Sequence, residues 1–205
     1  MPKLTKGLLF VFEGIDGGGK TTQAKQLQAL LEAEEFEVIY FREPSDSRWG
    51  QLIREKASKE DSLTPEEELD LFVKDRKENI THNLRPALLQ KKVVILDRYY
   101  FSTIAYQGAK GIDPEVIREI HASFVVVPDL VFILDVKADL GLERIEDRGQ
   151  RDLLFEREDY LKKVRELFQS FHGEQIFHID AMRPPEEVGV DISQIAQDYI
   201  RFFVE

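Results

Sequence analysis

The sequence predicts an α/β protein built on a five-stranded parallel sheet that is wrapped by helices. Two observations carry this prediction: short apolar runs recur along the chain with helical segments between them, and the runs are mostly continuous rather than alternating. Continuous β-branched and aromatic runs are expected of strands covered on both faces. Strands that alternate with helices are expected to lie parallel in one sheet. Five runs are predicted to be strands: 8–12, 37–41, 93–97, 130–136 and 175–180.

The intervening segments are predicted to be helices. One is expected to begin with a capping box, because Thr64 can cap the first turn, Pro65 suits the first helical position, and Glu67 lies three residues after the cap. Three of these helices can be given positions: one after Gly19, one from Pro65 to about Leu89, and one after the proline pair 184–185 towards Phe202.

Length and composition limit the class of protein. The chain has 205 residues, which suits a single domain over residues 1–205. A net charge of −11 argues against a nucleic-acid partner, because an acidic surface repels phosphate backbones. No apolar run is long enough for a membrane span, and the first residues do not resemble a signal peptide. The absence of cysteine fits a reducing cytoplasm, where we expect the protein to act.

A glycine-rich segment directly follows the first predicted strand and opens the first predicted helix. It matches G-x-x-x-x-G-K-[ST], the phosphate-binding loop of P-loop NTPases, in the structural context that the motif requires. Lys20 is expected to reach the β- and γ-phosphates of a nucleoside triphosphate, and the Thr21 hydroxyl to ligate Mg²⁺. The alternative is a tight turn with an exposed lysine. The residues predicted to bind the nucleotide are Gly14, Ile15, Asp16, Gly17, Gly18, Gly19, Lys20, Thr21 and Thr22.

The motif predicts a nucleoside triphosphate but not the reaction. The Asn-Lys-x-Asp motif with which GTPases read guanine does not occur in the sequence. A small acidic chain with a local cluster of arginines suggests phosphoryl transfer to a small acceptor. Such a ligand is expected beyond the carboxyl ends of the strands, and four of the five runs end in or near polar residues there: Arg42, Asp97, Asp135 and Asp180.

Two further segments carry candidate acceptor residues. After the third strand, Asp97 could hold Mg²⁺ through water and Arg98 could clamp a phosphate; a surface ion pair is the alternative. On the helix from Pro65, Phe72 and Arg76 share one face; the alternative is a core phenylalanine beside an arginine that extends into solvent. Ser102 and Tyr106 share a face of the next helix, as do Thr103 and Gln107.

Four arginines gather between residues 144 and 158: Arg144, Arg148, Arg151 and Arg157. Gly149 offers a hinge within the cluster. A lid that closes over a phosphate in transfer needs such side chains. The alternative is a solvated helix of mixed charge.

Taken together, these segments resemble the thymidylate kinase family. The resemblance is carried in order by FEGIDGGGKTTQ (12–23), REP (42–44), LFVKDR (71–76), DRYYFSTIAYQG (97–108), RGQRD (148–152) and HIDA (178–181). It covers most of the chain and is more specific than any single motif. It implies a P-loop kinase fold with an arginine-rich lid, phosphoryl transfer from ATP to dTMP with Mg²⁺, and a homodimer.

The resemblance also implies roles for individual residues. Phe72 would stack on thymine, Arg76 would donate to its O4 carbonyl, and Thr103 and Gln107 would face the base. Tyr106 would crowd the 2′ position of the sugar. Asp16 would hold the 3′-hydroxyl, and Arg98 would grip the acceptor phosphate. The residues predicted to bind substrate are Asp16, Arg42, Phe72, Arg76, Arg98, Ser102, Thr103, Tyr106 and Gln107.

The chain differs from parts of the family at two positions. Some members carry a catalytic arginine in the glycine loop where this chain has Gly17, and members without it carry basic lid residues instead. Arg151 and Arg148 are therefore the catalytic candidates in the lid, with Arg151 preferred because it precedes Asp152. The family also often has Gly-Gly-Thr after Arg-Glu-Pro, where this chain has Ser45-Asp46-Ser47. The residues predicted to be catalytic are Lys20, Asp97, Arg98, Arg148 and Arg151.

Two other functions stay open at this point. The first is a kinase of another nucleoside monophosphate or of a deoxynucleoside; deoxynucleoside kinases tend to show Glu-Arg-Ser where this chain has Asp97-Arg98-Tyr99. The second is a nucleotide-binding module without turnover, against which the intact Lys20 and Thr21 argue.

Overall fold

The computed structural model describes residues 2–58, 63–146 and 154–205. Its five strands form one parallel sheet in the order β2-β3-β1-β4-β5, which confirms the predicted fold class. Each strand covers one of the predicted runs to within one residue at either end. The strands are β1 (Leu8–Glu13), β2 (Val38–Arg42), β3 (Val93–Asp97), β4 (Leu130–Asp135) and β5 (Ile176–Asp180).

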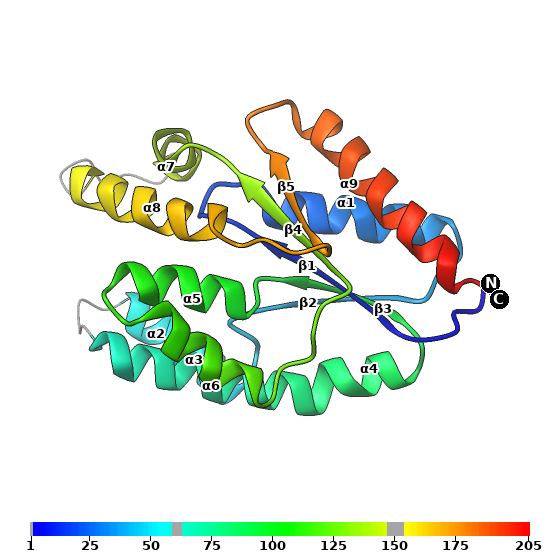
Figure 1. Cartoon of the computed structure of the whole chain (residues 1–205), viewed down its shortest axis with the longest axis horizontal. Helices are drawn as coiled ribbons and strands as arrows, with labels where there is room; N and C mark the ends of the chain where they lie inside the picture. Colours follow the sequence, from blue (N-terminus) through cyan, green and yellow to red (C-terminus); the bar gives the residue numbers. More distant parts are fainter. Residues whose placement is uncertain (1, 59–62, 147–153) are drawn as a thin grey trace.

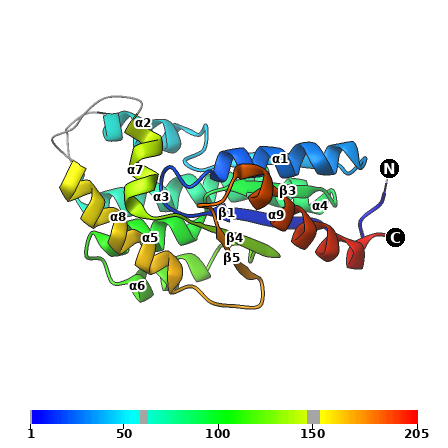
Figure 2. The same cartoon turned by 90° about the horizontal axis from the view of Figure 1, so that it is seen from above.

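Helices cover both faces of the sheet, as Figures 1 and 2 show. On one face α1 (Lys20–Ala33) lies against α9 (Pro185–Ile200), and α1 contacts β1, β2 and β3. On the other face α4 (Arg85–Leu89) and α8 (Leu154–Gln169) contact the sheet, and α5 (Tyr100–Ala109) packs on α8. The remaining described α-helices lie outside these layers: α2 (Arg48–Ser58), α3 (Pro65–Asn79), α6 (Pro114–Ala122) and α7 (Ala138–Glu146).

The strand register brings the polar strand ends together. Asp97 at the end of β3 pairs with Phe12 of β1 on one side and with Arg42 of β2 on the other. At the far side of the sheet, Asp135 of β4 pairs with Asp180 of β5. The strand ends therefore meet at one edge of the sheet, as expected for parallel strands.

The long helix from Pro65 has the predicted start and end. The Thr64 hydroxyl accepts from the Glu67 backbone N–H, and the Glu67 carboxylate accepts from the Thr64 backbone N–H, so the capping box is present. The helix continues as α3, a π-helical turn η1 (Ile80–Leu84) and α4, which ends at Leu89. The widened turn lies directly before Pro86, whose ring would clash with a carbonyl one turn earlier in a regular helix.

The two ends of the chain lie side by side at the edge of the sheet opposite the strand ends just described (Figure 1). Leu4 forms a β-bridge with Val204, and Thr5 donates to the Phe203 carbonyl. A short 3-10 turn, η2 (Arg201–Phe203), connects α9 to this bridge. No helix among the described residues is long and apolar enough to cross a membrane.

Candidate active site

The glycine loop connects β1 to α1 and fits its surroundings only with glycine at two of its positions. Gly14 and Gly17 have φ angles of 133° and 77°, which side chains rarely adopt. A Cβ at Gly14 would lie 2.5 Å from the Leu134 carbonyl oxygen, and one at Gly17 would lie 2.1 Å from the carbonyl oxygen of Gly141 in α7. The loop therefore exposes backbone rather than side chains at the N-terminus of α1, where free N–H groups favour the binding of an anion.

Lys20 begins α1 and points back into the loop. Its Nζ donates to the Ile15 carbonyl over 2.7 Å, and the side chain is buried. Burial, and then the nearby charge of Arg98, lower the pKa of Lys20 to about 7. A phosphate bound in the loop would favour the protonated form, because it adds negative charge beside the ammonium.

Thr21 and Asp97 place two hard oxygen ligands together. The Thr21 hydroxyl donates to Asp97 Oδ2 over 2.5 Å, and the Tyr40 hydroxyl donates to the same oxygen over 3.0 Å. Within the described residues no group of three or more His, Cys, Asp or Glu side chains could hold a metal. Mg²⁺ usually takes one or two protein ligands and completes its shell with phosphates and water, so this pair fits Mg²⁺.

Arg98 lies between the glycine loop and α5, with a left-handed backbone at φ 71°. Its Nη1 donates to the Ser102 hydroxyl over 3.0 Å, and its Nη2 pairs with the Asp16 carboxylate. The Tyr106 hydroxyl also donates to Asp16, over 3.0 Å. Burial raises the pKa of Asp16, but the charges of Arg98 and Lys20 outweigh it and hold that pKa below its usual value.

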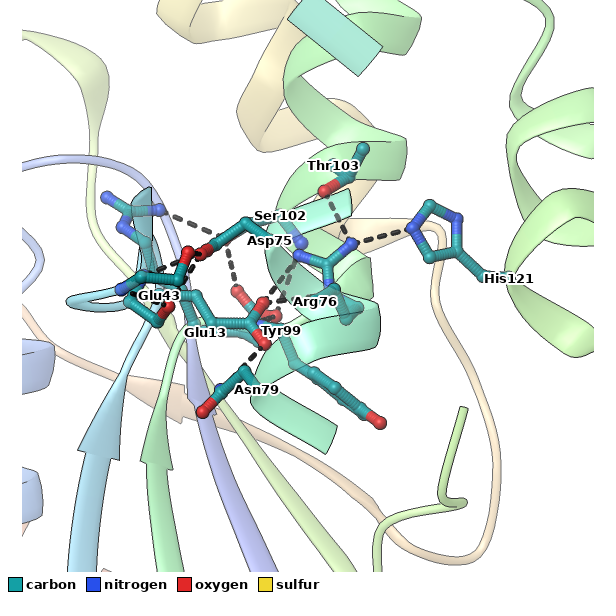
Figure 3. Close-up of polar contacts among 12 residues, drawn as sticks. Glu13, Glu43, Asp75, Arg76, Asn79, Tyr99, Ser102, Thr103 and His121 are labelled. Atoms are coloured by element: carbon teal, nitrogen blue, oxygen red, sulfur yellow. Dashed lines mark hydrogen bonds and ion pairs between the residues drawn. The ribbon is translucent and has the colours of Figure 1, made fainter. Parts of the chain in front are cut away.

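Arg76 is almost fully buried, so the alternative in which it extends into solvent is wrong. Figure 3 shows its guanidinium held from several sides. Nε donates to Glu43 Oε2 over 2.8 Å and Nη2 lies 2.7 Å from the same oxygen, while Nη1 lies 2.9 Å from the Thr103 hydroxyl and 2.6 Å from His121 Nε2. The hydrogen bonds use the N–H of Nε and both N–H groups of Nη1, whereas the contact of Nη2 with Glu43 is an ion pair, so Nη2 keeps an N–H group for a further partner.

His121 accepts from Arg76 as a neutral ring. Its Nδ1 lies 2.7 Å from the Ile117 carbonyl, which can only accept, so Nδ1 carries the hydrogen and Nε2 is free to accept. Burial, and then the charge of Arg76, lower the pKa of His121 to about 3. The sequence analysis did not identify this residue, because nothing in its local pattern marks it.

Two other polar residues of this region, Glu13 and Asp75, were also missed, and Glu43 was noted only as part of the Arg-Glu-Pro motif. Glu13 is a fully buried acidic residue at the end of β1. The sequence could have identified it, because it is a charged residue at the end of an apolar strand. Glu43 accepts from Arg76 and, over 3.1 Å, from Asn79. Asp75 accepts from the Ser45 backbone N–H over 2.8 Å and from the hydroxyls of Ser45 and Ser47 over 2.5 and 2.6 Å. The serines that replace Gly-Gly-Thr thus tie this loop to α3.

One cavity of about 350 Å³ brings the predicted acceptor residues together. Gln107 Nε2 donates to Glu68 over 2.8 Å, whereas Gln107 Oε1 is buried with no hydrogen-bond partner among the described residues. The lining of this cavity includes all nine residues predicted to bind substrate: Asp16, Arg42, Phe72, Arg76, Arg98, Ser102, Thr103, Tyr106 and Gln107. A larger cavity of about 850 Å³ opens beside β2, but neither Arg76 nor Arg98 lines it.

The predicted lid lies partly outside the described residues. This holds for both catalytic candidates there, Arg148 and Arg151. Arg144 in α7 is described, and its guanidinium donates to the carbonyls of Gly17 over 3.3 Å and Ala181 over 3.2 Å. The stem of the predicted lid therefore contacts the glycine loop.

Comparison with known proteins points to one family. Residues 12–192 match the sequence profile of a protein family described as thymidylate kinase. A probable thymidylate kinase of Archaeoglobus fulgidus is 42% identical over 193 residues, which cover 94% of this chain and 96% of that protein. A thymidylate kinase of Akkermansia muciniphila is 47% identical over 91% of this chain and 90% of its own length. One of Brachyspira hyodysenteriae is 46% identical over 89% and 90%.

Proposed function

This chain belongs to the thymidylate kinase family and is an enzyme that transfers a phosphoryl group from ATP to dTMP, and we propose that dTMP binds in the cavity of about 350 Å³. An oxygen of the dTMP phosphate forms a bond to the γ-phosphorus of ATP. The bond from that phosphorus to the bridging oxygen breaks, which yields dTDP and ADP. Because the attacking oxygen is already an anion, no strong general base is needed, and the protein mainly positions the groups and neutralises charge.

The observation that carries the proposal is that all nine predicted acceptor residues, Arg76 and Gln107 among them, line this one cavity. Arg76 keeps an N–H on Nη2, and Gln107 Oε1 has no partner among the described residues. Thymine offers the complementary pair, an O4 acceptor beside an N3–H donor. Cytosine offers the reverse, an amino donor beside a bare N3, and would leave buried polar groups unpaired. Phe72 lines the same cavity and would stack on the base.

The phosphates lie between the glycine loop and Arg98 in this proposal. The loop N–H groups and Lys20 bind the β- and γ-phosphates of ATP, and Arg98 binds the dTMP phosphate. Thr21 and Asp97 would hold Mg²⁺, which when bound neutralises charge on the donor phosphates. Lys20 and Arg98 then face the transferring group from opposite ends, where charge develops.

The remaining parts of the proposal concern the sugar, the lid and the assembly. Asp16 binds the 3′-hydroxyl, and Tyr106, which donates to Asp16, lies where it crowds the 2′ position. A lid arginine, Arg151 or Arg148, completes the charge neutralisation. The protein acts in the cytoplasm as a homodimer, an assembly that analytical ultracentrifugation tests directly.

The proposed acceptor is tested by measuring ADP formation with dTMP, dUMP, dCMP, AMP and UMP. We expect turnover with dTMP and a much lower kcat/KM with dCMP, AMP and UMP. Lys20→Ala is the control: it should nearly abolish turnover and leave the melting curve unchanged, because the lysine neutralises charge that grows during transfer. Preference for AMP or UMP would identify a different monophosphate kinase. Binding of ATP without ADP formation would identify a module that does not turn over.

A further inference from the structure

Glu13 is a buried carboxylate whose three hydrogen bonds all reach the start of α5. Its Oε1 accepts from the backbone N–H groups of Tyr99 over 2.7 Å and Ser102 over 3.2 Å. Its Oε2 accepts from the Ser102 hydroxyl over 2.5 Å. Figure 3 shows Glu13 close to both residues. The side chain is fully buried, and this burial raises the pKa of Glu13 to about 7.

This arrangement supplies α5 with a cap from another element. Tyr99 occupies the N-cap position of α5 and makes no capping hydrogen bond with its own side chain. A carboxylate at a helix N-terminus satisfies free N–H groups and interacts favourably with the helix dipole. Because Glu13 directly precedes Gly14, the same residue connects the glycine loop to the helix that carries Thr103, Tyr106 and Gln107.

The Ser102 hydroxyl extends this connection to Arg98. It donates to Glu13 and accepts from Arg98 Nη1 over 3.0 Å. The backbone of Arg98 is also held, because its N–H donates to the Phe12 carbonyl over 2.9 Å at a left-handed φ of 71°. A left-handed arginine persists only where its surroundings hold it. The two residues that precede Gly14 thus restrain both the backbone and the guanidinium of Arg98.

We propose that Glu13 is a positioning residue of the acceptor site, which holds α5 and, through the Ser102 hydroxyl, aims the Arg98 guanidinium at the acceptor phosphate. The inference rests on the proposed role of Arg98. An acidic group within one hydroxyl of a phosphate-binding arginine does not favour phosphate binding by its charge, so its contribution there is to the geometry of α5 and Arg98. Glu13 itself touches neither substrate nor Mg²⁺ in this arrangement.

The test compares Michaelis constants in Glu13→Gln. Glutamine keeps the shape and one acceptor, but replaces Oε2 with an NH₂ group that cannot accept from Ser102. We expect the KM for dTMP to rise about 10- to 150-fold, the factor that corresponds to one hydrogen bond to a charged group. The KM for ATP should change less than about threefold, because the glycine loop keeps its own contacts.

Asp129→Asn is the matched control. Asp129 lies at the opposite edge of the sheet. It likewise accepts from a backbone N–H, that of Leu9, over 2.8 Å, and from a hydroxyl, that of Tyr199, over 3.2 Å, and it also pairs with Lys6 over 2.5 Å. The substitution should lower the melting temperature and leave both Michaelis constants unchanged. A Glu13→Gln variant that behaves like Asp129→Asn has only a structural role, and that result overturns the inference.

A double-mutant cycle with Ser102→Ala tests the route. If Glu13 acts through the hydroxyl, Glu13→Gln combined with Ser102→Ala should raise the KM for dTMP no more than the worse single variant does. Fully additive effects would overturn the route through Ser102. Arg98→Ala distinguishes failure of the proposed role of Arg98 from failure of the inference about Glu13. If Arg98→Ala leaves the KM for dTMP unchanged, the proposed role of Arg98 is wrong. If it raises that KM while Glu13→Gln does not, only the inference about Glu13 is wrong.

Discussion

At the scale of single residues, Arg76 depends on partners from three other segments of the chain. Glu43 follows β2, Thr103 lies in α5 and His121 in α6, and each contacts the guanidinium at 2.9 Å or less. Glu43 and Arg76 form a buried ion pair. Because both charges are removed from water, the lost hydration offsets much of their attraction, and the pair is stabilised mainly by the good geometry of its contacts. These contacts restrict the orientation of the Arg76 side chain, which is what a residue needs in order to distinguish one base from another.

Arg76→Ala should narrow the ratio of kcat/KM for dTMP to that for dCMP by about 10- to 150-fold, because one charged hydrogen bond separates the two bases. The dTMP reaction should lose most of the difference. Steady-state kinetics with both nucleotides measure the ratio. Phe72→Ala is the control and should weaken both substrates alike, since stacking does not distinguish them strongly. If Arg76→Ala slows both nucleotides equally, Arg76 does not read the base.

At the scale of elements, the glycine loop and α7 approach each other through their backbones. Gly17 and Gly141 face one another, and a Cβ at Gly141 would lie 2.8 Å from the Asp16 carbonyl oxygen. The arginine that some family members carry at position 17 would meet the Gly141 carbonyl in this arrangement. The close approach therefore leaves no space for a side chain at position 17.

Gly17→Ala should destabilise the protein by about 2 kcal/mol or more, because a left-handed alanine costs about 1–2 kcal/mol and the clash with Gly141 adds to it. Gly111→Ala is the matched control: Gly111 has a φ of 103° with open space around its Cβ position, so only the backbone cost should appear. Urea unfolding of both variants gives the comparison. Equal losses would mean that α7 moves aside without cost.

Arg151→Ala should lower kcat by at least about 100-fold, the lower end for loss of a preorganised donor in the transition state. The KM for dTMP should change little, because this donor acts only on the transferring group. Single-turnover kinetics would confirm that the chemical step has slowed. A change in KM alone would make Arg151 a binding residue and Arg148 the better catalytic candidate.

At the scale of the whole molecule, two buried groups give folding stability opposite dependences on pH. His121 is held neutral with a pKa of about 3, so the unfolded chain binds a proton below pH 6.5 while the folded protein does not. Its stabilising contribution is complete above pH 6.5 and is lost as the pH falls towards 3. Glu13, with a pKa raised from 4.5 to about 7, takes up its proton first in the folded state, which favours folding as the pH falls from 7 to 4.5.

Replacing His121 should therefore make the protein less sensitive to acid. The unfolding free energy of the wild type minus that of His121→Gln should fall by up to about 1.4 kcal/mol for each pH unit as the pH is lowered from 6.5 to 3. The unfolding free energy of the wild type minus that of Glu13→Gln should instead rise as the pH is lowered from 7 to 4.5. Chemical denaturation across this range measures both differences. Parallel curves for the wild type and His121→Gln would show that the folded protein protonates His121 at the same pH as the unfolded chain does, so that its pKa is not lowered.

The sequence by itself determined the architecture and predicted which residues bind the acceptor. Continuous apolar runs identified the five strands, the Thr64 and Glu67 pair identified the start of α3, and the glycine motif identified the phosphate loop. These signals are local, since strand burial, helix capping and tight turns depend on residues a few positions apart. The resemblance to a known family supplied the acceptor residues, and all nine of them line one cavity.

Only the tertiary structure decided which polar groups hold those residues in place. Glu13 reaches Ser102 across 89 positions of the chain, Asp75 reaches Ser45 across 30, and His121 reaches Arg76 across 45. No periodicity reports such pairs, because each depends on the order of strands in the sheet and on how the helices pack over it. Burial then makes these contacts obligatory: a polar group removed from water must find a partner, and the fold alone determines which partner lies within reach.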